Sequence, residues 1–405
     1  MKLITAISGL ALSGLLTGCG GGIPESIQSM SPDAVFTPLS TAKSDSFIGT
    51  GIGGTMSPID LYQHYNIPST LSGVGTTIAI VDTAGTGNIS ADCNTFSVQY
   101  KLPACNIQTL NLSTKSNNGD PNWTLEVALD VEWAHAMAPN AKIILVTAKS
   151  GGLDDMVSAI YTAASQPGVV AVSMSWGTTE WSGQVNAAYD GVFAHFPNVA
   201  FFASAGDNGN YLNSQNWPAA NPLVTAVGGT AITKRGPAVA GGETGWRYSG
   251  GGYSAYETMP TYQLSSPDLS NNEKTINRNR RAIPDVSYNA DNTISPVAVY
   301  SQGMWYSVGG TSAGAPQWAG IVALWGQYLA QKKVSLGQTL AYYGGLNNIL
   351  YQSKYYNPSR PAFFDVLLGN NNTSVQQCSV CQAGAGFDDI TGLGEPNVTN
   401  FFSYF

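Results

Sequence analysis

The stretch at residues 309–316 reads GGTSAGAP, and it places Ser312 among glycines and alanines just before an apolar run at 318–329. The small neighbours let another polypeptide backbone approach the serine hydroxyl. The apolar run predicts a helix, whose N-terminal N–H groups and positive dipole end would face that hydroxyl. Nucleophilic serines are usually presented in this way, so Ser312 is a candidate nucleophile.

A serine nucleophile needs a base, which is usually histidine. The chain has three histidines, His64, His135 and His195, and all of them precede Ser312. Residues 310–314 match the G-x-S-x-G turn of esterases, but that fold requires its histidine after the serine. A subtilisin-type triad would use the strand that ends at Asp82, yet none of the three histidines has the surroundings it requires. We therefore expect all three histidines to be structural.

Carboxylates are the remaining candidates for the base. Residues 123–136 predict a helix on which Glu126 and Asp130, four positions apart, share one face. This face could simply be acidic and solvated. However, the neighbouring residues are apolar and only 10% of the chain is charged. Two carboxylates in such surroundings predict a site in which at least one pKa is raised.

A third carboxylate, Asp207, follows an apolar strand predicted at 199–205 and lies between glycines. Open α/β sheets bind ligands at the carboxyl ends of their strands. The alternative is a turn aspartate that bonds to its own backbone, and the residues alone favour that alternative.

Taken in order, these three elements resemble the sedolisin family, the serine-carboxyl peptidases. The similarity runs from about residue 56 to the C-terminus. It includes VSMSWG at 172–177, TAVGGT at 225–230, GGGYS at 250–254 and IPDVS at 283–287. The resemblance implies a subtilisin-like α/β fold with a mostly parallel seven-stranded sheet flanked by helices on both faces. Apolar strands predicted near 77–81, 142–147, 169–174 and 199–204, separated by helical stretches, agree with it.

The resemblance also implies a role for each site residue. Ser312 would attack a peptide carbonyl, Glu126 would accept its proton, Asp130 would orient Glu126, and a protonated Asp207 would donate to the oxyanion. In acid a histidine is already protonated, whereas a carboxylate with a pKa near 4 still accepts a proton. Only a neutral Asp207 can donate a hydrogen bond. We therefore expect an acid-active endopeptidase that acts on polypeptides; the alternatives are an exported serine esterase and a non-catalytic exported binding protein that retains the fold.

Two aspartates on separate glycine-rich segments, at 364–371 and 383–394, suggest a cation site, although they could be ordinary polar turns. Calcium prefers carboxylate and backbone carbonyl oxygens. The resemblance implies a Ca²⁺ site built from the Asp365 and Asp388 carboxylates and the carbonyls of Val366, Gly384 and Gly386.

Residues 1–18 have signal-peptide proportions, and LTGC at 16–19 matches a bacterial lipoprotein cleavage box. Lipidation of Cys19 would anchor the exported enzyme to a bacterial membrane; free extracellular release is the alternative. Residues 19–55 are rich in glycine, serine, proline and threonine and predict a flexible tether, with one peptidase domain at 56–405. Sedolisins normally carry a long pro-region, and we expect this chain to lack it.

Four further cysteines, Cys93, Cys105, Cys378 and Cys381, predict two disulfides in an exported chain. The local pairs 93–105 and 378–381 are the simplest choice; redox activity or zinc binding at the second pair is the alternative. A net charge of −8 argues against nucleic-acid binding, and we expect a monomer. The short mixed-charge cluster at 274–281 is expected to be a solvated loop.

Overall fold

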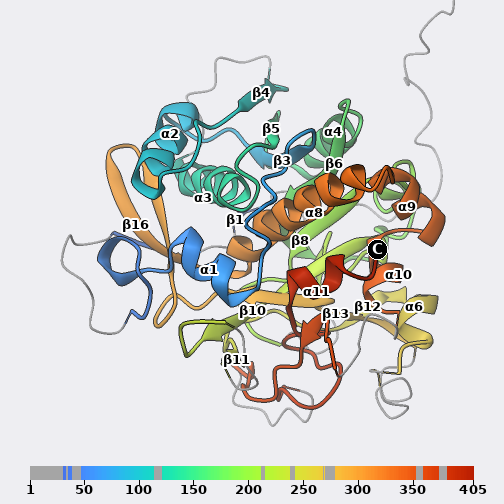
Figure 1. Ribbon diagram of the computed structural model, residues 1–405. Helices are drawn as coiled ribbons and strands as arrows, with labels where there is room; N and C mark the ends of the chain where they lie inside the picture. Colours follow the sequence, from blue (N-terminus) through green and yellow to red (C-terminus); the bar gives the residue numbers. More distant parts are fainter. Residues whose placement is uncertain are drawn as a thin grey trace, which may run out of the picture.

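A computed structural model describes residues 31–32, 35–38, 47–113, 121–210, 215–237, 242–267, 269, 279–352, 359–373 and 381–405. Within these residues, seven parallel strands form the central sheet (Figure 1). Their order is β4 (Ile107–Asn111), β5 (Lys142–Ala148), β3 (Thr77–Thr83), β6 (Val169–Met174), β8 (Ala200–Ser204), β10 (Val224–Ile232) and β14 (Val286–Asn289). An antiparallel strand, β11 (Glu243–Gly245), extends β10. The predicted α/β fold with its seven-stranded parallel sheet is confirmed.

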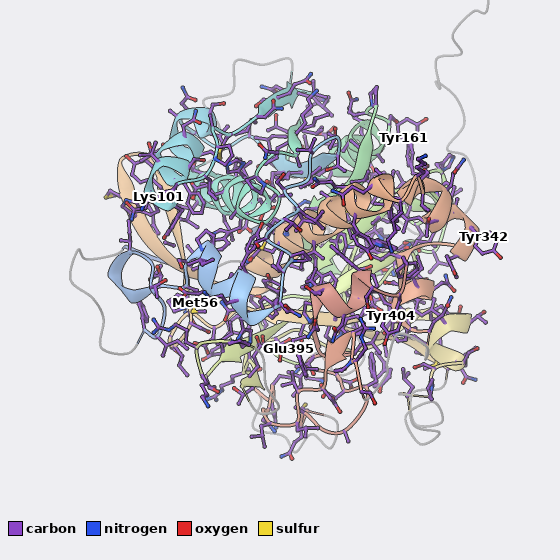
Figure 2. All side chains as sticks on the ribbon, viewed as in Figure 1. Met56, Lys101, Tyr161, Tyr342, Glu395 and Tyr404 are labelled. Atoms are coloured by element: carbon purple, nitrogen blue, oxygen red, sulfur yellow. A yellow bond between two sulfur atoms is a disulfide. The ribbon has the colours of Figure 1, made fainter. Side chains whose placement is uncertain are left out.

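Helices cover both faces of the sheet because its strands are apolar on both sides. On β3, Ile78 and Ile80 pack with α3 (Pro121–Met137) and α8 (Gly314–Gln331), whereas Ala79 and Val81 pack with α4 (Leu153–Ala164). Side chains alternate between the faces of a strand, so one short segment contributes to two cores. The side chains fill the space between the ribbons (Figure 2).

The remaining elements surround this layered centre. The helices are η2 (Ile52–Gly54), α1 (Pro58–His64), α2 (Ile89–Tyr100), α5 (Gly191–Ala194), α6 (Thr261–Leu264), η3 (Thr311–Ala313), α9 (Leu336–Tyr343), α10 (Leu346–Leu350) and α11 (Val398–Phe402). The strands are β1 (Ser31–Pro32), β2 (Val35–Pro38), β7 (Trp176–Thr179), β9 (Asn216–Trp217), β12 (Gly252–Thr258), β13 (Arg280–Ile283), β15 (Val297–Ser301), β16 (Met304–Gly309), β17 (Phe363–Phe364) and β18 (Glu395–Pro396). Among the described helices, none is long and apolar enough to cross a membrane.

Described parts of the range 19–55, where the sequence predicts a flexible tether, pair with strands of the domain. β1 pairs antiparallel with β7, and β2 pairs antiparallel with β16. Residues 49–55 form backbone hydrogen bonds among themselves, and Ile48 N donates to Ile294 O at 3.2 Å. The edges of β7 and β16 supply the backbone partners of β1 and β2. Cys19 lies outside the described residues.

Arg281, expected in a solvated loop, is fully buried. Its guanidinium forms an ion pair with Asp285, and Nη1 donates to Asp285 Oδ1 at 2.8 Å. Arg280 is half-buried, and residues 274–278 of the cluster lie outside the described residues. The expectation was wrong for Arg281 because a buried carboxylate from the next turn of chain satisfies its charge.

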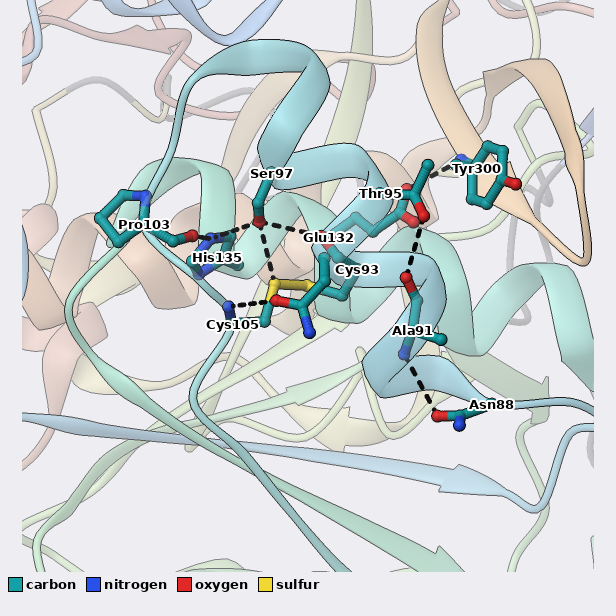
Figure 3. Close-up of a disulfide and its surroundings, with 11 residues drawn as sticks. Asn88, Ala91, Cys93, Thr95, Ser97, Pro103, Cys105, Glu132, His135 and Tyr300 are labelled. Atoms are coloured by element: carbon teal, nitrogen blue, oxygen red, sulfur yellow. Dashed lines mark hydrogen bonds between the residues drawn. A yellow bond between two sulfur atoms is a disulfide. The ribbon is translucent and has the colours of Figure 1, made fainter.

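A disulfide joins Cys93 to Cys105, with a Cα–Cα distance of 6.2 Å, and confirms the first predicted pair (Figure 3). It closes the segment that follows α2 onto that helix. Cys381 is also disulfide-bonded, and its predicted partner Cys378 lies outside the described residues. Disulfides form and persist in oxidising compartments, so this bond fits the expectation of export.

Candidate active site

Ser312 lies in η3, the short turn between β16 and α8. The turn begins after Gly310, whose φ of 127° is open to glycine but strained for other residues. The serine is fully buried, and its Oγ donates to the carbonyl of Ser175 at 3.5 Å. The sequence therefore forms the expected turn, and the hydroxyl faces the segment that follows β6.

Glu126 and Asp130 lie one turn apart on α3, as predicted, and both are fully buried. α3 packs against α8 and against η3, the turn that holds Ser312. Ser175 Oγ donates to Asp130 Oδ1 at 2.7 Å and lies 3.3 Å from the carbonyl oxygen of Ser312. Ser175 therefore contacts both the carboxylate helix and the serine turn.

A third carboxyl group, Asp82 at the carboxyl end of β3, adds to this buried charge. Burial raises the pKa of Asp130 well above its usual range, and the charges of Asp82 and Glu126 raise it further. Burial raises the pKa of Asp82 to about 8. The three carboxyl groups cannot all be ionised at once in such surroundings, which confirms the predicted raised pKa. Sequence reasoning considered Asp82 only as a member of a subtilisin-type triad and missed this association.

Asp207 lies beside Thr311, the residue before Ser312. The backbone N–H and the hydroxyl of Thr311 both donate to Asp207 Oδ1, each at 2.8 Å. Gly206, with a φ of 107°, turns the chain between β8 and Asp207. The structure therefore brings Asp207 to the serine turn, and the alternative of a purely local turn aspartate is wrong.

The edge of β7 next to the serine already carries an extended segment of the chain. Ser31 pairs with Gly177 and Pro32 pairs with Trp176, the residue after Ser175. Beyond two intervening residues, Val35 pairs with Gly309 at the end of β16. Extended backbone thus pairs with the strands on both sides of the Ser312 turn.

A cavity of about 410 Å³ opens at the carboxyl ends of β3, β4 and β5. Thr124 and Val127, which flank Glu126 on α3, contribute to its lining. Half of the other lining residues carry hydroxyl or amide side chains, and Asp92 supplies the only carboxyl group among them.

The three histidines have partners away from Ser312. His64 Nδ1 donates to Gly236 O at 2.8 Å and Nε2 lies 2.9 Å from Glu243 Oε1, so both ring nitrogens face acceptors. Burial alone would lower the pKa of His64, but Glu243 and Glu395 raise it to about 10. Glu395, labelled in Figure 2, is buried with them, and the three side chains could also hold a metal ion.

Burial lowers the pKa of His135 to about 4, and its Nε2 lies 3.0 Å from Ser97 Oγ (Figure 3). His195 is exposed, and its Nδ1 lies 2.7 Å from Gly191 O. Structural roles therefore account for His64, His135 and His195, as expected from the sequence.

The two segments expected to bind calcium come together. Gly386 N donates to Asp365 Oδ2 at 2.8 Å, and Gly384 N donates to Asp388 Oδ2 at 3.1 Å, so one glycine loop contacts both aspartates. Asp365 Oδ1 is buried and has no hydrogen-bond partner, and Val366 is buried beside it. Burial raises the pKa of Asp365, and raises that of Asp388 to about 6. An orphaned buried oxygen and two desolvated carboxylates suit a hard cation.

Comparison with known proteins decides the family. A model of the subtilase family matches residues 113–340. The chain belongs to the subtilase family. Among the relatives of this subtilase, kumamolisin from Bacillus sp. strain MN-32 is 32% identical over 84% of the chain and 62% of kumamolisin. Tripeptidyl-peptidase 1 from Dictyostelium discoideum is 31% identical over 76% of the chain and 51% of that protein.

A solved structure of Pseudomonas sedolisin, a serine-carboxyl proteinase complexed with pseudo-iodotyrostatin, superposes on this subtilase with a TM-score of 0.70. It is 26% identical and covers 86% of this chain and 97% of the sedolisin chain. These similarities place the subtilase in the sedolisin and kumamolisin family, whose members are serine-carboxyl peptidases. The chain spans only about half to three fifths of the curated relatives named here.

Proposed function

We propose that this protein is an acid-active serine endopeptidase that uses Ser312 as nucleophile, Glu126 as general base, Asp130 to orient Glu126, and Asp207 as oxyanion donor. One observation carries the proposal. The turn that holds Ser312 packs against the helix of Glu126 and Asp130, and Asp207 is hydrogen-bonded to the adjacent Thr311. The described histidines all have their ring contacts elsewhere.

The chemistry follows from the protonation states that acid favours. Ser312 Oγ attacks the peptide carbonyl carbon while its proton passes to the Glu126 carboxylate. The carbonyl oxygen becomes an oxyanion and accepts a hydrogen bond from neutral Asp207; loss of one such donor typically costs about 10²–10³ in kcat. Glu126 then gives its proton to the leaving amine. The acyl group is now an ester on Ser312 Oγ. A water molecule attacks this ester while Glu126 takes its proton, and Glu126 then returns the proton to Ser312 Oγ as the acid product leaves.

Cleavage inside a polypeptide is supported by the paired segments of the N-terminal region. A tripeptidyl-peptidase must close one end of its cleft to hold a free amino terminus. Here β1 pairs with β7 on one side of the Ser312 turn and β2 pairs with β16 on the other. Both edges accept extended backbone, which is how a bound polypeptide would pass the serine in both directions.

Peptides with a blocked amino terminus test this function. We expect an acetylated, internally quenched peptide library to be cleaved with a maximum below pH 5, because the base must be a carboxylate and Asp207 must be neutral. The enzyme should show no preference for tripeptide substrates with a free amine over acetylated substrates. Ser312→Ala should abolish both reactions. Cleavage confined to free amino termini would make the enzyme a tripeptidyl-peptidase, and a maximum above pH 7 would contradict the carboxylate mechanism.

We also propose that calcium binds at Asp365 and Asp388, with backbone carbonyls of Val366, Gly384 and Gly386 as further ligands. The orphaned Asp365 Oδ1 and the desolvated Asp388 carboxylate support this assignment. When bound, the ion would neutralise both carboxylates and join the loop at 384–386 to the segment after β17. Its role would be structural, since neither aspartate contacts the Ser312 turn in the described hydrogen bonds.

Without calcium, the stability of the protein should depend on the ionisation of Asp388. The pKa of Asp388 is about 6 in the folded protein and roughly 4 in the unfolded chain. The free energy of unfolding of the ion-free protein should therefore fall by roughly 2–3 kcal/mol as pH rises from 4 through 6. Calcium favours the ionised form and removes this loss. We therefore expect EDTA to lower the melting temperature more at pH 6 than at pH 4. Asp388→Asn should abolish the response to calcium; an equal response in wild type and variant would contradict the site.

We further propose export with lipidation at Cys19 and a monomeric enzyme acting on polypeptides. The Cys93–Cys105 disulfide supports an oxidising compartment outside the cytoplasm. The mass of the N-terminal peptide from membrane-associated protein tests for lipid on Cys19.

A further inference from the structure

Thr311 directs both of its hydrogen-bond donors toward Asp207. Its backbone N–H and its hydroxyl donate to the same oxygen, Asp207 Oδ1, both at 2.8 Å. The hydroxyl in turn accepts from Gly206 N at 3.1 Å. Thr311 is fully buried, so water does not compete for these groups.

The direction of the hydroxyl proton follows from these contacts. A hydroxyl has one proton to donate, and the Gly206 N–H donates into its oxygen. The Thr311 proton is therefore directed at Asp207 Oδ1, the remaining partner. Two N–H or O–H groups now converge on one carboxyl oxygen.

A carboxyl oxygen that accepts two hydrogen bonds is the poorer position for a proton. A neutral carboxyl group carries its single proton on one oxygen and accepts hydrogen bonds through the other. With Oδ1 engaged as the acceptor, the acid proton resides on Oδ2. A neutral Asp207 without this constraint could hold its proton on either oxygen, and with the proton on Oδ1 it could not donate from Oδ2.

We propose that Thr311 is a positioning residue that fixes which oxygen of Asp207 carries the proton and so keeps Asp207 ready to donate to the oxyanion. This inference rests on the proposed function of Asp207. It adds that the residue before the nucleophile prepares the acid. Thr311 and Ser312 are successive residues of η3. This turn therefore holds both the nucleophile and the residue that prepares the oxyanion donor.

Thr311→Val tests the proposal because it keeps the backbone N–H and the branched shape but removes the hydroxyl. We expect kcat at the acid plateau to fall about five- to fiftyfold with KM nearly unchanged, since the interaction serves the transition state. The alkaline limb of the pH–rate profile should move to higher pH. The reason is that ionised Asp207 loses a hydrogen-bond donor, which raises its pKa. Thr311→Ser, which keeps the hydroxyl, should restore at least a third of the wild-type kcat.

A double-mutant cycle separates positioning from a general structural effect. If Thr311 acts through Asp207, Thr311→Val should add less than twofold to the loss caused by Asp207→Ala. Affinity for a peptide aldehyde, which forms an oxyanion-like adduct with the serine, should fall by the same factor as kcat/KM. Melting curves verify that each variant folds. Thr311→Ala replaces the valine variant if the latter does not fold.

The outcomes distinguish this inference from the function on which it rests. If Asp207→Ala lowers kcat at least a hundredfold while the hydroxyl-free variants keep the wild-type kcat and pH profile, positioning by Thr311 is wrong and the proposed function stands. Additive losses in the cycle also reject positioning. If Asp207→Ala is fully active, the proposed function itself fails.

Discussion

Glu126→Gln should lower kcat by about 10⁴–10⁶, the range seen when a serine peptidase loses its base or nucleophile. Glutamine has nearly the same shape as glutamate but cannot accept the Ser312 proton. Glu126 lies on α3, which packs against both α8 and η3, so the helix should keep its position. We expect KM to change little. Steady-state kinetics at the acid optimum provide the measurement.

Glu132→Gln is the matched control. Glu132 lies on the same helix and is also fully buried, and burial raises its pKa well above its usual range. Its Oε2 accepts from Tyr300 N at 2.9 Å, in β15. The same substitution there should leave kcat within a few fold of wild type. Equal losses in both variants would mean that a buried carboxyl group on α3 matters only for folding.

The sequence predicted the parts of the site that depend on local periodicity. The spacing of Glu126 and Asp130 sufficed to put both on one face of a helix, and the apolar residues around them indicated the burial that raises the pKa of Asp130. The small residues around Ser312 and the apolar run after it predicted the turn and α8. Such features involve residues within one or two helical turns.

Contacts between distant segments could not be read from spacing. Ser175 follows β6, which pairs with β3, and its hydrogen bond to Asp130 on α3 joins residues 45 positions apart. Thr311 meets Asp207 across 104 positions. The residues around Asp207 alone favoured a local turn, and only the ordered resemblance to a family linked Asp207 with the serine.

Composition misled at Arg281, which was expected in a solvated loop. The side chain is fully buried and is paired with the buried Asp285 carboxylate. A partner four positions along the chain replaces water there. A residue's own polarity does not report that replacement.

Asp285→Asn should lower the free energy of unfolding by about 3–5 kcal/mol, the usual cost of leaving a buried charge without its partner. Arg281 and Asp285 are both fully buried. The Asp285 carboxylate also accepts from Ala226 N at 2.8 Å and from Tyr351 Oη at 2.9 Å. An asparagine would leave the guanidinium uncompensated and would turn an NH₂ group toward donors.

Asp291→Asn is the control for this substitution. Asp291 is nearly buried, but its Oδ1 accepts from Thr293 N, Thr293 Oγ1 and Ile294 N, within its own turn, and no cation is paired with it among the described ion pairs. Asparagine keeps an acceptor oxygen, so the loss should stay below about 1 kcal/mol. Urea unfolding of both variants with calcium present measures the difference. Similar small losses would show that Arg281 finds another way to satisfy its charge. A large loss confined to Asp285→Asn would establish that the Arg281–Asp285 ion pair stabilises the junction between β13 and β14, and β14 packs against the serine turn.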